Sequence, residues 1–182
     1  MKLGIPKETV AGETRVATTP EITKKLVAKG FEVCVERAAG AAAYYPDADY
    51  EAAGATLTDA AGAFGCDLVA KVRKPAVEET ALFADRALYI GLAETCESDP
   101  AIDALHQKGV TVLSMERVPR ISRAQSMDAL SSQSNIGGYR AVLEAVAHYG
   151  RFFPLMMTSA GSAKPARVVV LGAGVAGLQA IA

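Results

Sequence analysis

Residues 168–177 read VVVLGAGVAG, an apolar run that leads into a glycine-rich turn. Its glycines, Gly172, Gly174 and Gly177, have the spacing G-x-G-x-x-G. Between a strand and a helix, this spacing allows a tight turn, lets a pyrophosphate approach the backbone and lets the helix pack close to the strand. The N–H groups and dipole of a helix beginning at Ala173 would favour that anion. The stretch predicts the start of a Rossmann domain that binds a dinucleotide, with an ordinary strand-to-helix turn as the alternative.

The residues that would complete such a domain lie outside the 182 residues of the chain. An acidic residue that binds the ribose is expected about 20 residues after the turn, which falls beyond Ala182. We therefore expect the truncated start of an NAD-binding domain, in a fragment or in one half of a split gene product. The usual acidic residue cannot decide between NAD and NADP here.

The composition is that of a folded globular chain. Hydrophobic residues make up 51% and charged residues 21%, close to the averages of about 45–50% and 25%, which argues against intrinsic disorder. The 19 basic and 20 acidic residues give a net charge of −1, so the composition indicates no nucleic acid partner. The sequence has no apolar run of about 18 residues, and its opening MKLGIPKE does not resemble a signal peptide. A role at a membrane would need a partner.

Strand-like and helix-like segments alternate before the glycine-rich turn. Apolar or alternating runs predict strands at Lys2–Ile5, Phe31–Val35, Asp67–Val72, Leu88–Ala93 and Val110–Leu113. Helices are predicted after the cap Thr19, with an apolar stripe of Ile22, Leu26 and Val27, within Tyr44–Gly54, and over Asp99–Lys108 after the cap Ser98. This alternation predicts an α/β fold, with a mainly parallel sheet in a first Rossmann-like domain and helices on both faces.

A long helix is predicted after the first domain, because residues 129–149 contain no proline and many apolar residues. Gly137 and Gly138 inside it each cost up to about 1 kcal/mol relative to alanine, which suggests the close approach of another backbone, or a bend. A connector, Arg151–Lys164, then leads to a predicted strand at Arg167–Leu171. The expected organisation is an N-terminal α/β domain over residues 1–128, a linking helix over 129–150, and the connector with the truncated Rossmann start over 151–182.

A polar loop, Pro119–Asp128, precedes the long helix and follows the end of a predicted strand. Polar side chains gather in it and just after it: Arg120, Ser122, Arg123, Gln125, Ser126, Asp128 and Ser131. Loops at the carboxyl ends of strands are where α/β proteins bind ligands. Arginine can bind a carboxylate or phosphate through two hydrogen bonds, and a glutamine amide can pair with a carboxamide. The alternative is a plain helix start, with Asp128 as its cap and solvated arginines.

Other residues with possible chemistry have structural explanations. The sequence contains three cysteines, at Cys34, Cys66 and Cys96. They form no C-x-x-C pair, so buried free thiols are expected rather than disulfides or a zinc site. His106 and His148 are expected on the surface, and no metal site is predicted. The acidic pair Glu78–Glu79 predicts a solvated helix start.

Three strings of the sequence are similar to a known family: PRISRAQSMDALSSQSN at residues 119–135, the GYRAV that follows soon after, and the later VVVLGAGVAGLQAIA. In these strings the chain resembles the NAD(H)-binding component, domain I, of the proton-translocating nicotinamide nucleotide transhydrogenases. The opening GIPKET…GETRVATTP is similar to this component and to the related alanine dehydrogenases. The resemblance covers all 182 residues, whereas domain I of the family is about twice as long.

The resemblance implies an oxidoreductase in which hydride passes directly between NAD(H) and NADP(H). By this resemblance, Arg120 and Gln125 orient the nicotinamide ring and its amide, while Asp128 and Ser131 hold the dihydronicotinamide. The pyrophosphate would be held by Gly172, Gly174 and Gly177. Such a transfer needs positioning rather than an acid or a base, because no proton moves at the carbon centres.

The resemblance also implies partners. The complete component is expected to be a homodimer of two-domain subunits, with NAD(H) in the cleft between the domains. It would lie on the cytoplasmic side of a membrane proton-channel domain, as a peripheral part, and meet a separate NADP(H)-binding domain. Hydride transfer would be coupled to proton translocation through the membrane part. The 182-residue chain alone is expected to be inactive.

Two alternatives are an amino-acid oxidoreductase of the alanine dehydrogenase type and a catalytically inactive fragment. Alanine dehydrogenases have an acid/base histidine in an L-H-L-A string and a substrate-binding lysine in K-V-K-E-P. Here the matching strings IGLA and KVRKP place Gly91 and Arg73 at those positions. A third substrate residue of that family, Arg15, is present and is expected to form a structural ion pair. These differences disfavour alanine oxidation.

Overall fold

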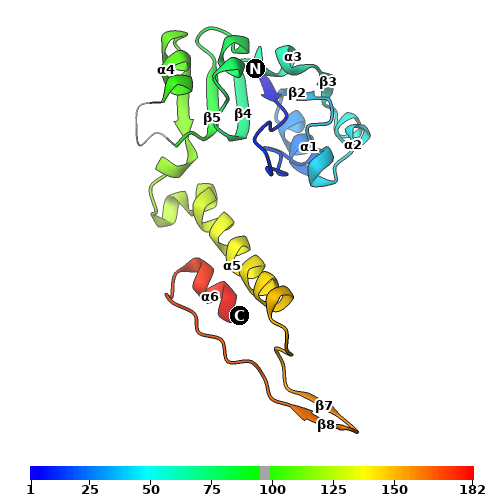
Figure 1. Ribbon diagram of the computed structural model, residues 1–182. Helices are drawn as coiled ribbons and strands as arrows, with labels where there is room; N and C mark the ends of the chain where they lie inside the picture. Colours follow the sequence, from blue (N-terminus) through cyan, green and yellow to red (C-terminus); the bar gives the residue numbers. More distant parts are fainter. Residues whose placement is uncertain (95–98) are drawn as a thin grey trace. The chain divides into compact units, whose positions relative to one another are not determined.

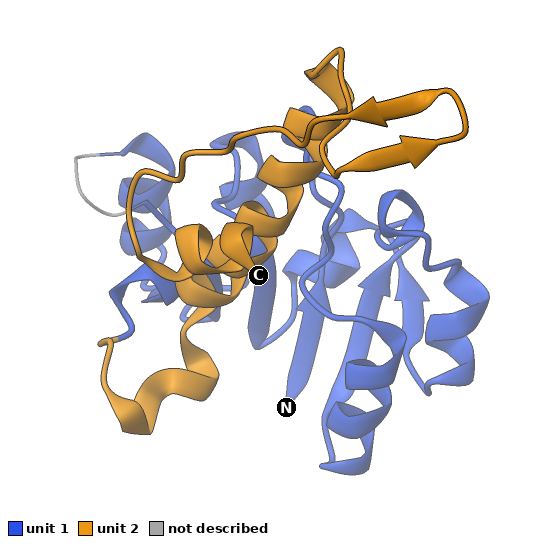
Figure 2. Cartoon of the chain, turned by 90° about the horizontal axis from the view of Figure 1, so that it is seen from below, with its two compact units in different colours: residues 1–118 blue, residues 119–182 orange. Residues whose placement is uncertain are grey.

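The computed structural model describes residues 1–94 and 99–182 (Figure 1). By its internal contacts the chain divides into two compact units, Met1–Val118 and Pro119–Ala182, which Figure 2 colours separately. The division falls before the polar loop, whereas the boundary expected from the sequence falls after it, at Asp128. The polar loop therefore groups with the long helix that follows it.

Unit 1 is built around a sheet of six parallel strands. They are β1 (Lys2–Ile5), β2 (Glu32–Glu36), β3 (Thr56–Thr58), β4 (Leu68–Arg73), β5 (Leu88–Leu92) and β6 (Thr111–Ser114), in the order β3-β2-β1-β4-β5-β6. The order reverses between β1 and β4, which makes this pair the topological switch point of a doubly wound fold. The predicted α/β fold with a mainly parallel sheet is confirmed.

Helices cover both faces of this sheet. They are α1 (Pro20–Ala28), α2 (Asp47–Ala52), α3 (Ala60–Phe64) and α4 (Pro100–Gln107), with 3₁₀ turns η1 (Ala41–Ala43), η2 (Glu78–Leu82) and η3 (Met115–Arg117). Alternate residues of a strand point to opposite faces, and two separate cores result. One contains Ile5 and Val35 with Tyr50 of α2, and the other contains Val69 and Tyr89 with Phe64 of α3.

The start of α1 follows the prediction, but its buried face does not. Thr19 caps the helix by accepting a hydrogen bond from the N–H of Ile22 at 3.4 Å, and proline occupies the first turn. Thr23 is fully buried, whereas Ile22 is 43% exposed. The predicted apolar stripe is therefore wrong at Ile22, because the helix turns the neighbouring residue towards the core.

The cap of α4 also differs from the prediction. The carboxylate of Asp99 accepts hydrogen bonds from the N–H groups of Ala101 and Ile102, at 2.9 and 3.4 Å. Asp99 has an extended backbone directly before the first helical residue, so Asp99 caps the helix. Ser98 and Cys96 lie outside the described residues.

β3 and α3, which are both short, were not predicted from the sequence. β3 has three residues at one end of the strand order. α3 has five residues and contains a glycine, Gly62, whose N–H donates to the capping carboxylate of Asp59 at 2.8 Å. Segments of this length give no measurable periodicity, so their packing in the sheet and its helices defines them.

Unit 2 contains the long helix and the glycine-rich turn. Its elements are η4 (Ser122–Met127), α5 (Ala129–His148), the antiparallel strands β7 (Met156–Thr158) and β8 (Gly161–Ala163), and α6 (Val175–Ile181). The predicted long helix is confirmed. So is the close approach of another backbone at Gly138, where an added Cβ would lie 2.2 Å from the carbonyl oxygen of Ala176. At Gly137 such an atom would meet nothing within 4 Å.

One expectation for the end of the chain is wrong. The strand predicted at Arg167–Leu171 does not form, and within the described part of the chain this segment pairs with no other strand. Val169 and Leu171 are 80% and 94% exposed. A strand needs a neighbour for its N–H and C=O groups, so an apolar sequence alone is not sufficient. The connector Arg151–Lys164, in turn, contains the β7–β8 hairpin.

Candidate functional site

Asp128 fixes the start of α5. Its Oδ1 accepts the N–H of Ser131 at 2.9 Å and its Oδ2 accepts the hydroxyl of Ser131 at 2.7 Å. Because these bonds stabilise the charged form, they lower the pKa of the Asp128 carboxyl. Asp128 is thus a helix cap that also fixes the hydroxyl of Ser131.

A hollow of about 890 Å³ opens beside this helix start. Its lining includes every residue that the sequence assigned to the nicotinamide site: Arg120, Gln125, Asp128 and Ser131. Ile121, Ser122, Ser132, Asn135 and Val175 complete the lining. Guanidinium, amide, hydroxyl and carboxylate groups line the same space. The hollow can therefore form hydrogen bonds with a ligand that carries a carboxamide and sugar hydroxyls.

The glycine-rich turn has a backbone that side chains would obstruct. Gly172 has a φ of +110°, a conformation that favours glycine. A Cβ added at Gly177 would lie 2.2 Å from the carbonyl oxygen of Gly172, so α6 lies as near to the turn as glycine permits. At Gly174, by contrast, an added Cβ would meet nothing within 4 Å. The backbone there is open to a ligand, as a pyrophosphate-binding turn requires.

A second hollow, of about 330 Å³, lies over this turn. It is lined by Arg120, Ser131, Ser134, Leu171, Gly172, Gly174, Val175, Ala176 and Gly177. Arg120, Ser131 and Val175 line both hollows. Within unit 2 the fold therefore brings all seven predicted site residues to two adjoining spaces.

The packing of α5 against α6 brings the polar loop and the glycine-rich turn together. The Nδ2 of Asn135 on α5 donates to the Oε1 of Gln179 on α6 at 2.9 Å. One turn further along α5, Gly138 lies against the backbone of Ala176. Because Gly138 has no side chain, α6 can approach α5 closely, and this approach shapes the site.

Several lining residues were not predicted from the sequence, among them Ser132, Ser134, Asn135 and Val175. Ser134 and Asn135 follow Ser131 at the spacings i+3 and i+4, which place side chains on one face of a helix. That spacing could have identified them. Val175 carries no such signal, because only the approach of α6 brings it to the hollows.

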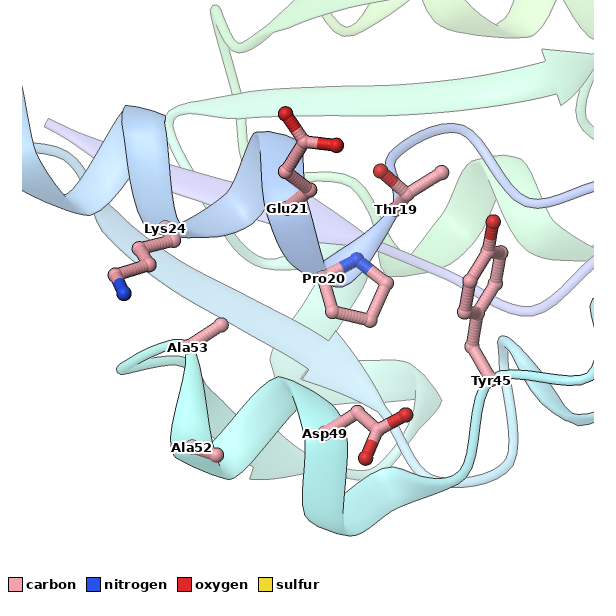
Figure 3. Close-up of a pocket in the computed structure, with 8 residues that line it drawn as sticks. All are labelled: Thr19, Pro20, Glu21, Lys24, Tyr45, Asp49, Ala52 and Ala53. Carbon is pink, nitrogen blue, oxygen red and sulfur yellow. The ribbon is translucent and has the colours of Figure 1, made fainter.

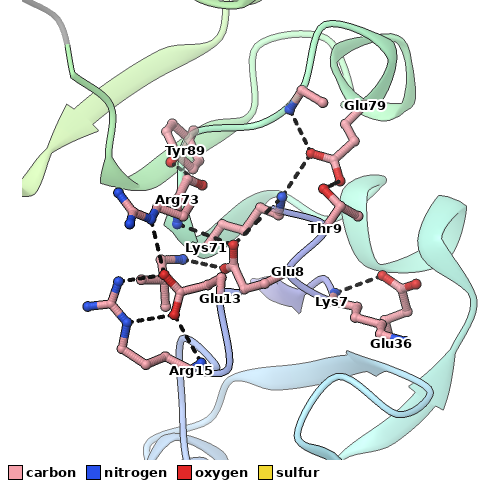
Figure 4. A network of polar contacts seen from close by, with 12 residues as sticks. Lys7, Glu8, Thr9, Glu13, Arg15, Glu36, Lys71, Arg73, Glu79 and Tyr89 are labelled. Carbon is pink, nitrogen blue, oxygen red and sulfur yellow. Dashed lines mark hydrogen bonds and ion pairs between the residues drawn. The ribbon is translucent and has the colours of Figure 1, made fainter. Parts of the chain in front are cut away.

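A second polar cluster lies in unit 1, at the carboxyl ends of β1 and β4 (Figure 4). The Lys71 side chain is completely buried, with its Nζ 2.8 Å from Oε2 of Glu79 and 3.8 Å from Oε2 of Glu8. Burial raises the pKa of Glu8. Glu79 also accepts the Thr9 hydroxyl at 3.1 Å. The prediction that Glu78–Glu79 is solvated is therefore wrong for Glu79, which Lys71 draws into the interior.

Glu13 joins two arginines in the same cluster. Its carboxylate, 5% exposed, accepts hydrogen bonds from Nε of Arg15 at 2.7 Å and from Nε of Arg73 at 3.1 Å. The hydrogen bond with Arg15, above all, lowers the pKa of Glu13 to about 2. The expected structural ion pair of Arg15 is confirmed. Both guanidiniums that could bind a substrate carboxylate here already bind a carboxylate of the protein.

Gly91 on β5 leaves no space for a side chain. An added Cβ would lie 2.2 Å from the carbonyl oxygen of Lys71 and 2.5 Å from the hydroxyl oxygen of Tyr89. That hydroxyl donates to the carbonyl of Arg73 at 3.1 Å. A histidine at position 91 would therefore displace Tyr89 and the neighbouring strand.

A third hollow, of about 440 Å³, lies between α1 and α2 (Figure 3). Its lining combines Glu21, Lys24 and Asp49 with small and apolar residues. Glu21 pairs with Lys25 at the surface, and the charged side chains of the lining are largely solvated. This arrangement indicates no particular chemistry.

The histidines and cysteines take structural positions. His106 and His148 are exposed, as predicted, and His148 Nε2 lies 3.6 Å from a Glu144 oxygen. Cys66 is buried as expected, whereas Cys34 is only half-buried, and both are free. Among the residues that the structure describes, no three potential metal ligands gather.

A parallel sheet of this strand order, with a glycine-rich strand-to-helix turn, defines a Rossmann-like α/β protein. Comparison with known families is more specific. The chain belongs to the alanine dehydrogenase/PNT family: the family's N-terminal domain matches residues 4–137 and its C-terminal domain matches residues 141–182.

The relatives include both branches of this family. The chain is 49% identical to an NAD(P) transhydrogenase subunit alpha of Rhodospirillum rubrum, over all of this chain and 49% of that protein. It is 35% identical to the alanine dehydrogenase of Halomonas elongata, over 99% of this chain and 49% of that protein. The chain thus spans about half the length of these relatives.

A solved structure of a transhydrogenase from Sinorhizobium meliloti has the same fold. It matches with a TM-score of 0.97 and 45% identity, over 100% of this chain and 55% of that chain. An L-alanine dehydrogenase matches with a TM-score of 0.82 and 29% identity, over 100% of this chain and 51% of its own. Along the described residues, no helix is long and apolar enough to cross a membrane.

Proposed function

We propose that this chain is the NAD(H)-binding part of a proton-translocating NAD(P) transhydrogenase. The observation that carries the proposal is the pair of adjoining hollows in unit 2, which share Arg120 and Ser131. One hollow is polar and the other lies over the glycine-rich turn. Their combined lining suits a ligand with a carboxamide at one end and a pyrophosphate further along. The relatives named as transhydrogenase subunits support the same assignment.

We infer a role for each residue from its chemistry, its place in the lining and the family resemblance. The amide of Gln125 can hydrogen-bond a nicotinamide carboxamide in both directions. Arg120 lines both hollows, so its guanidinium can interact with the carboxamide or with a phosphate oxygen. Ser131, oriented by Asp128, presents its hydroxyl next to the ring. The pyrophosphate would be held at the turn by Gly172, Gly174 and Gly177.

This set of residues suits hydride transfer. NAD(H), when bound, supplies or accepts the hydride, and the protein must hold one nicotinamide ring close to another. Asp128 is a poor proton donor, because its pKa is lowered and both its oxygens accept bonds from Ser131. Neither described histidine lines the hollows. The residues thus position a reaction in which no proton moves at carbon.

The proposal includes partners that the chain itself does not contain. A complete component would form a homodimer and meet a separate NADP(H)-binding domain, which carries the second nicotinamide. A membrane proton-channel domain would couple hydride transfer to proton translocation. The component would then lie on the cytoplasmic face of the membrane through these partners.

An alanine dehydrogenase is the less favoured activity. Reductive amination requires an acid/base group, and Gly91 stands where that family has its histidine, with no space for one. Arg73 stands at the lysine position and is bound to Glu13. A catalytically inactive fragment is the other alternative, and activity measurements distinguish it.

The experiment uses a longer form of the protein, called the full-length form. In it, residues 1–182 are followed by the remainder of the NAD(H)-binding component, so that its length equals that of the Rhodospirillum rubrum subunit. This form is mixed with an NADP(H)-binding partner subunit, and hydride transfer from NADPH to an NAD analogue is followed optically. We expect transfer that depends on both proteins, and no oxidation of alanine. Oxidation of alanine with NAD at an ordinary enzymatic rate would refute the proposal, and absence of both activities would favour the inactive alternative.

A further inference from the structure

Two cysteines of unit 1 lie on either side of Gly4 on β1. Gly4 is the register partner of Cys34 on β2, so their side-chain directions share one face of the sheet. A Cβ added at Gly4 would lie 3.2 Å from the Cβ of Cys66, which follows α3. The carbonyl group of Ala63 also fills the space that a side chain at position 4 would take, so α3 and the residues after it pack directly against β1. This packing brings Cys66 to the face of the sheet that Cys34 shares.

The register of Gly4 with Cys34 and the position of Cys66 beside Gly4 place the two thiols near each other. Both are free. The Sγ of Cys66 also donates to the carbonyl oxygen of Gly62 at 3.3 Å. Burial first, and then the neighbouring thiol, raise the pKa of Cys66 to about 12. In the reduced protein Cys66 is therefore a neutral thiol held beside Cys34.

The two thiols differ in their access to solvent. Cys34 is half-buried, whereas Cys66 is 2% exposed. A small oxidant in water therefore reaches Cys34 first, and Cys66 lies deeper beside it. An accessible thiol with a second thiol nearby is an arrangement in which a sulfenic acid can condense to a disulfide.

We propose that Cys34 and Cys66 form an oxidant-responsive dithiol site whose co-reactant is hydrogen peroxide. The Cys34 sulfur attacks the peroxide: an S–O bond forms, the O–O bond breaks, and the thiol proton joins the departing hydroxide, so that water leaves and a sulfenic acid remains. The Cys66 thiol then attacks the Cys34 sulfur: an S–S bond forms, the S–O bond breaks, and the thiol proton joins the departing hydroxide, so that a second water leaves. Two thiols are oxidised by two electrons in total, and one peroxide is reduced to two waters.

The disulfide would connect β2 to the segment between α3 and β4. It would lie on the face of the sheet where α3 packs against Gly4 of β1. It would close the loop between Cys34 and Cys66 in the unfolded chain and so reduce the entropy of that state. We expect the oxidised chain to unfold at a higher urea concentration than the reduced chain. The site is independent of the hollows in unit 2.

The test uses the 182-residue chain with Cys96→Ser, so that two cysteines remain. It is treated with hydrogen peroxide in native buffer, alkylated and weighed by mass spectrometry. We expect loss of both free thiols, a mass lower by two hydrogens, and a linked pair of peptides that contain Cys34 and Cys66 and that dithiothreitol separates. Two thiols that stay free, or disulfide-linked dimers as the main product, would overturn the proposal.

Two matched variants test the order of attack. With Cys66→Ser, Cys34 should accumulate as a sulfenic acid that a 1,3-diketone traps. With Cys34→Ser, Cys66 should remain a thiol under the same treatment. Equal trapping at Cys66 and Cys34 would refute the assigned roles. The disulfide itself is measured in the chain that keeps both cysteines, so the proposal stays testable even if a variant folds poorly.

Discussion

At the scale of single residues, the two arginines bound to Glu13 lead to a prediction of how the stability of the protein depends on pH. Arg15 and Arg73 lower its pKa from the usual 4.5 to about 2. A carboxyl whose pKa is lowered by folding stabilises the folded state above its usual pKa, and this contribution is lost as the pH falls through the lowered value. Glu13→Gln should therefore lower the free energy of unfolding at neutral pH by about 2 kcal/mol. The difference should shrink as the pH falls from 4.5 towards 2.

Urea unfolding of both chains, followed by circular dichroism at several pH values, measures this difference. Glu21→Gln is the matched control, since Glu21 pairs with Lys25 but is 77% exposed. Such a surface pair contributes little to stability, so this variant should unfold like the parent. A Glu13→Gln effect of constant size over the whole pH range would contradict the prediction.

The role proposed for Gln125 leads to a prediction about the rate of hydride transfer. Gln125→Ala in the full-length form should slow hydride transfer much more than it weakens NADH binding. Most of the binding free energy should come from the pyrophosphate and adenosine ends, whereas the amide of Gln125 fixes the ring. A misplacement of about 1 Å can cost about 100-fold in rate. Stopped-flow transfer rates and calorimetric titration with NADH separate the two effects.

Gln107→Ala is the control for this measurement, because Gln107 is an exposed residue at the end of α4, in unit 1. Its rate and affinity should equal those of the parent. If Gln125→Ala turned over at the parental rate, the role assigned to Gln125 would be incorrect.

Single residues also show the limit of sequence analysis. The cap at Asp128 and the three glycines of the turn could be predicted, because each pattern is contained in a few consecutive residues of the chain. Glu79 could not, since its burial depends on Lys71 from β4. Two adjacent glutamates are expected to be solvated when only the sequence is known, because the lysine that pairs with one of them is distant in the sequence and near only in the fold.

At the scale of elements, the contact between α5 and α6 predicts opposite effects at two adjacent glycines. Gly138→Ala should destabilise the full-length form by about 1–3 kcal/mol, because the new Cβ would press on the backbone of Ala176. Gly137→Ala should stabilise it by up to about 1 kcal/mol, since the position is open and alanine favours a helix. Urea unfolding of the two variants tests the pair, and equal effects at both positions would exclude the close contact.

Elements with strong periodicity or clear end signals could be predicted, and elements that depend on a neighbour could not. The long helix α5 needs only its own sequence, and its prediction from residue 129 to 149 agrees with Ala129–His148. The apolar segment Arg167–Leu171 has equally strong strand character but no neighbouring strand, so it stays irregular. The hairpin of β7 and β8 is the reverse case, in which two weak segments form strands by pairing with each other.

At the scale of the whole molecule, the fold class followed from the alternation of segments, but the strand order did not. The order β3-β2-β1-β4-β5-β6 depends on which strand each crossover reaches, and no local pattern encodes this. The residues of the candidate site, likewise, could be predicted from the sequence only in part. The glycine motif and the family resemblance indicated seven residues, whereas Val175 lines the site only because α6 packs against α5.

The 182-residue chain by itself should bind NADH poorly. Unit 2 supplies the turn and the seven-residue helix α6, but the segment before the turn has no partner strand and its Val168, Val169 and Leu171 are 59%, 80% and 94% exposed. A dinucleotide cleft also needs neighbouring strands and an acidic ribose ligand. A helix shorter than about 12–15 residues is marginal without packing, so the turn should be only loosely held. Calorimetric titration with NADH should give no saturable heat for this chain and clear binding for the full-length form. A low-micromolar dissociation constant for the 182-residue chain would show that the two hollows suffice without the rest of the domain.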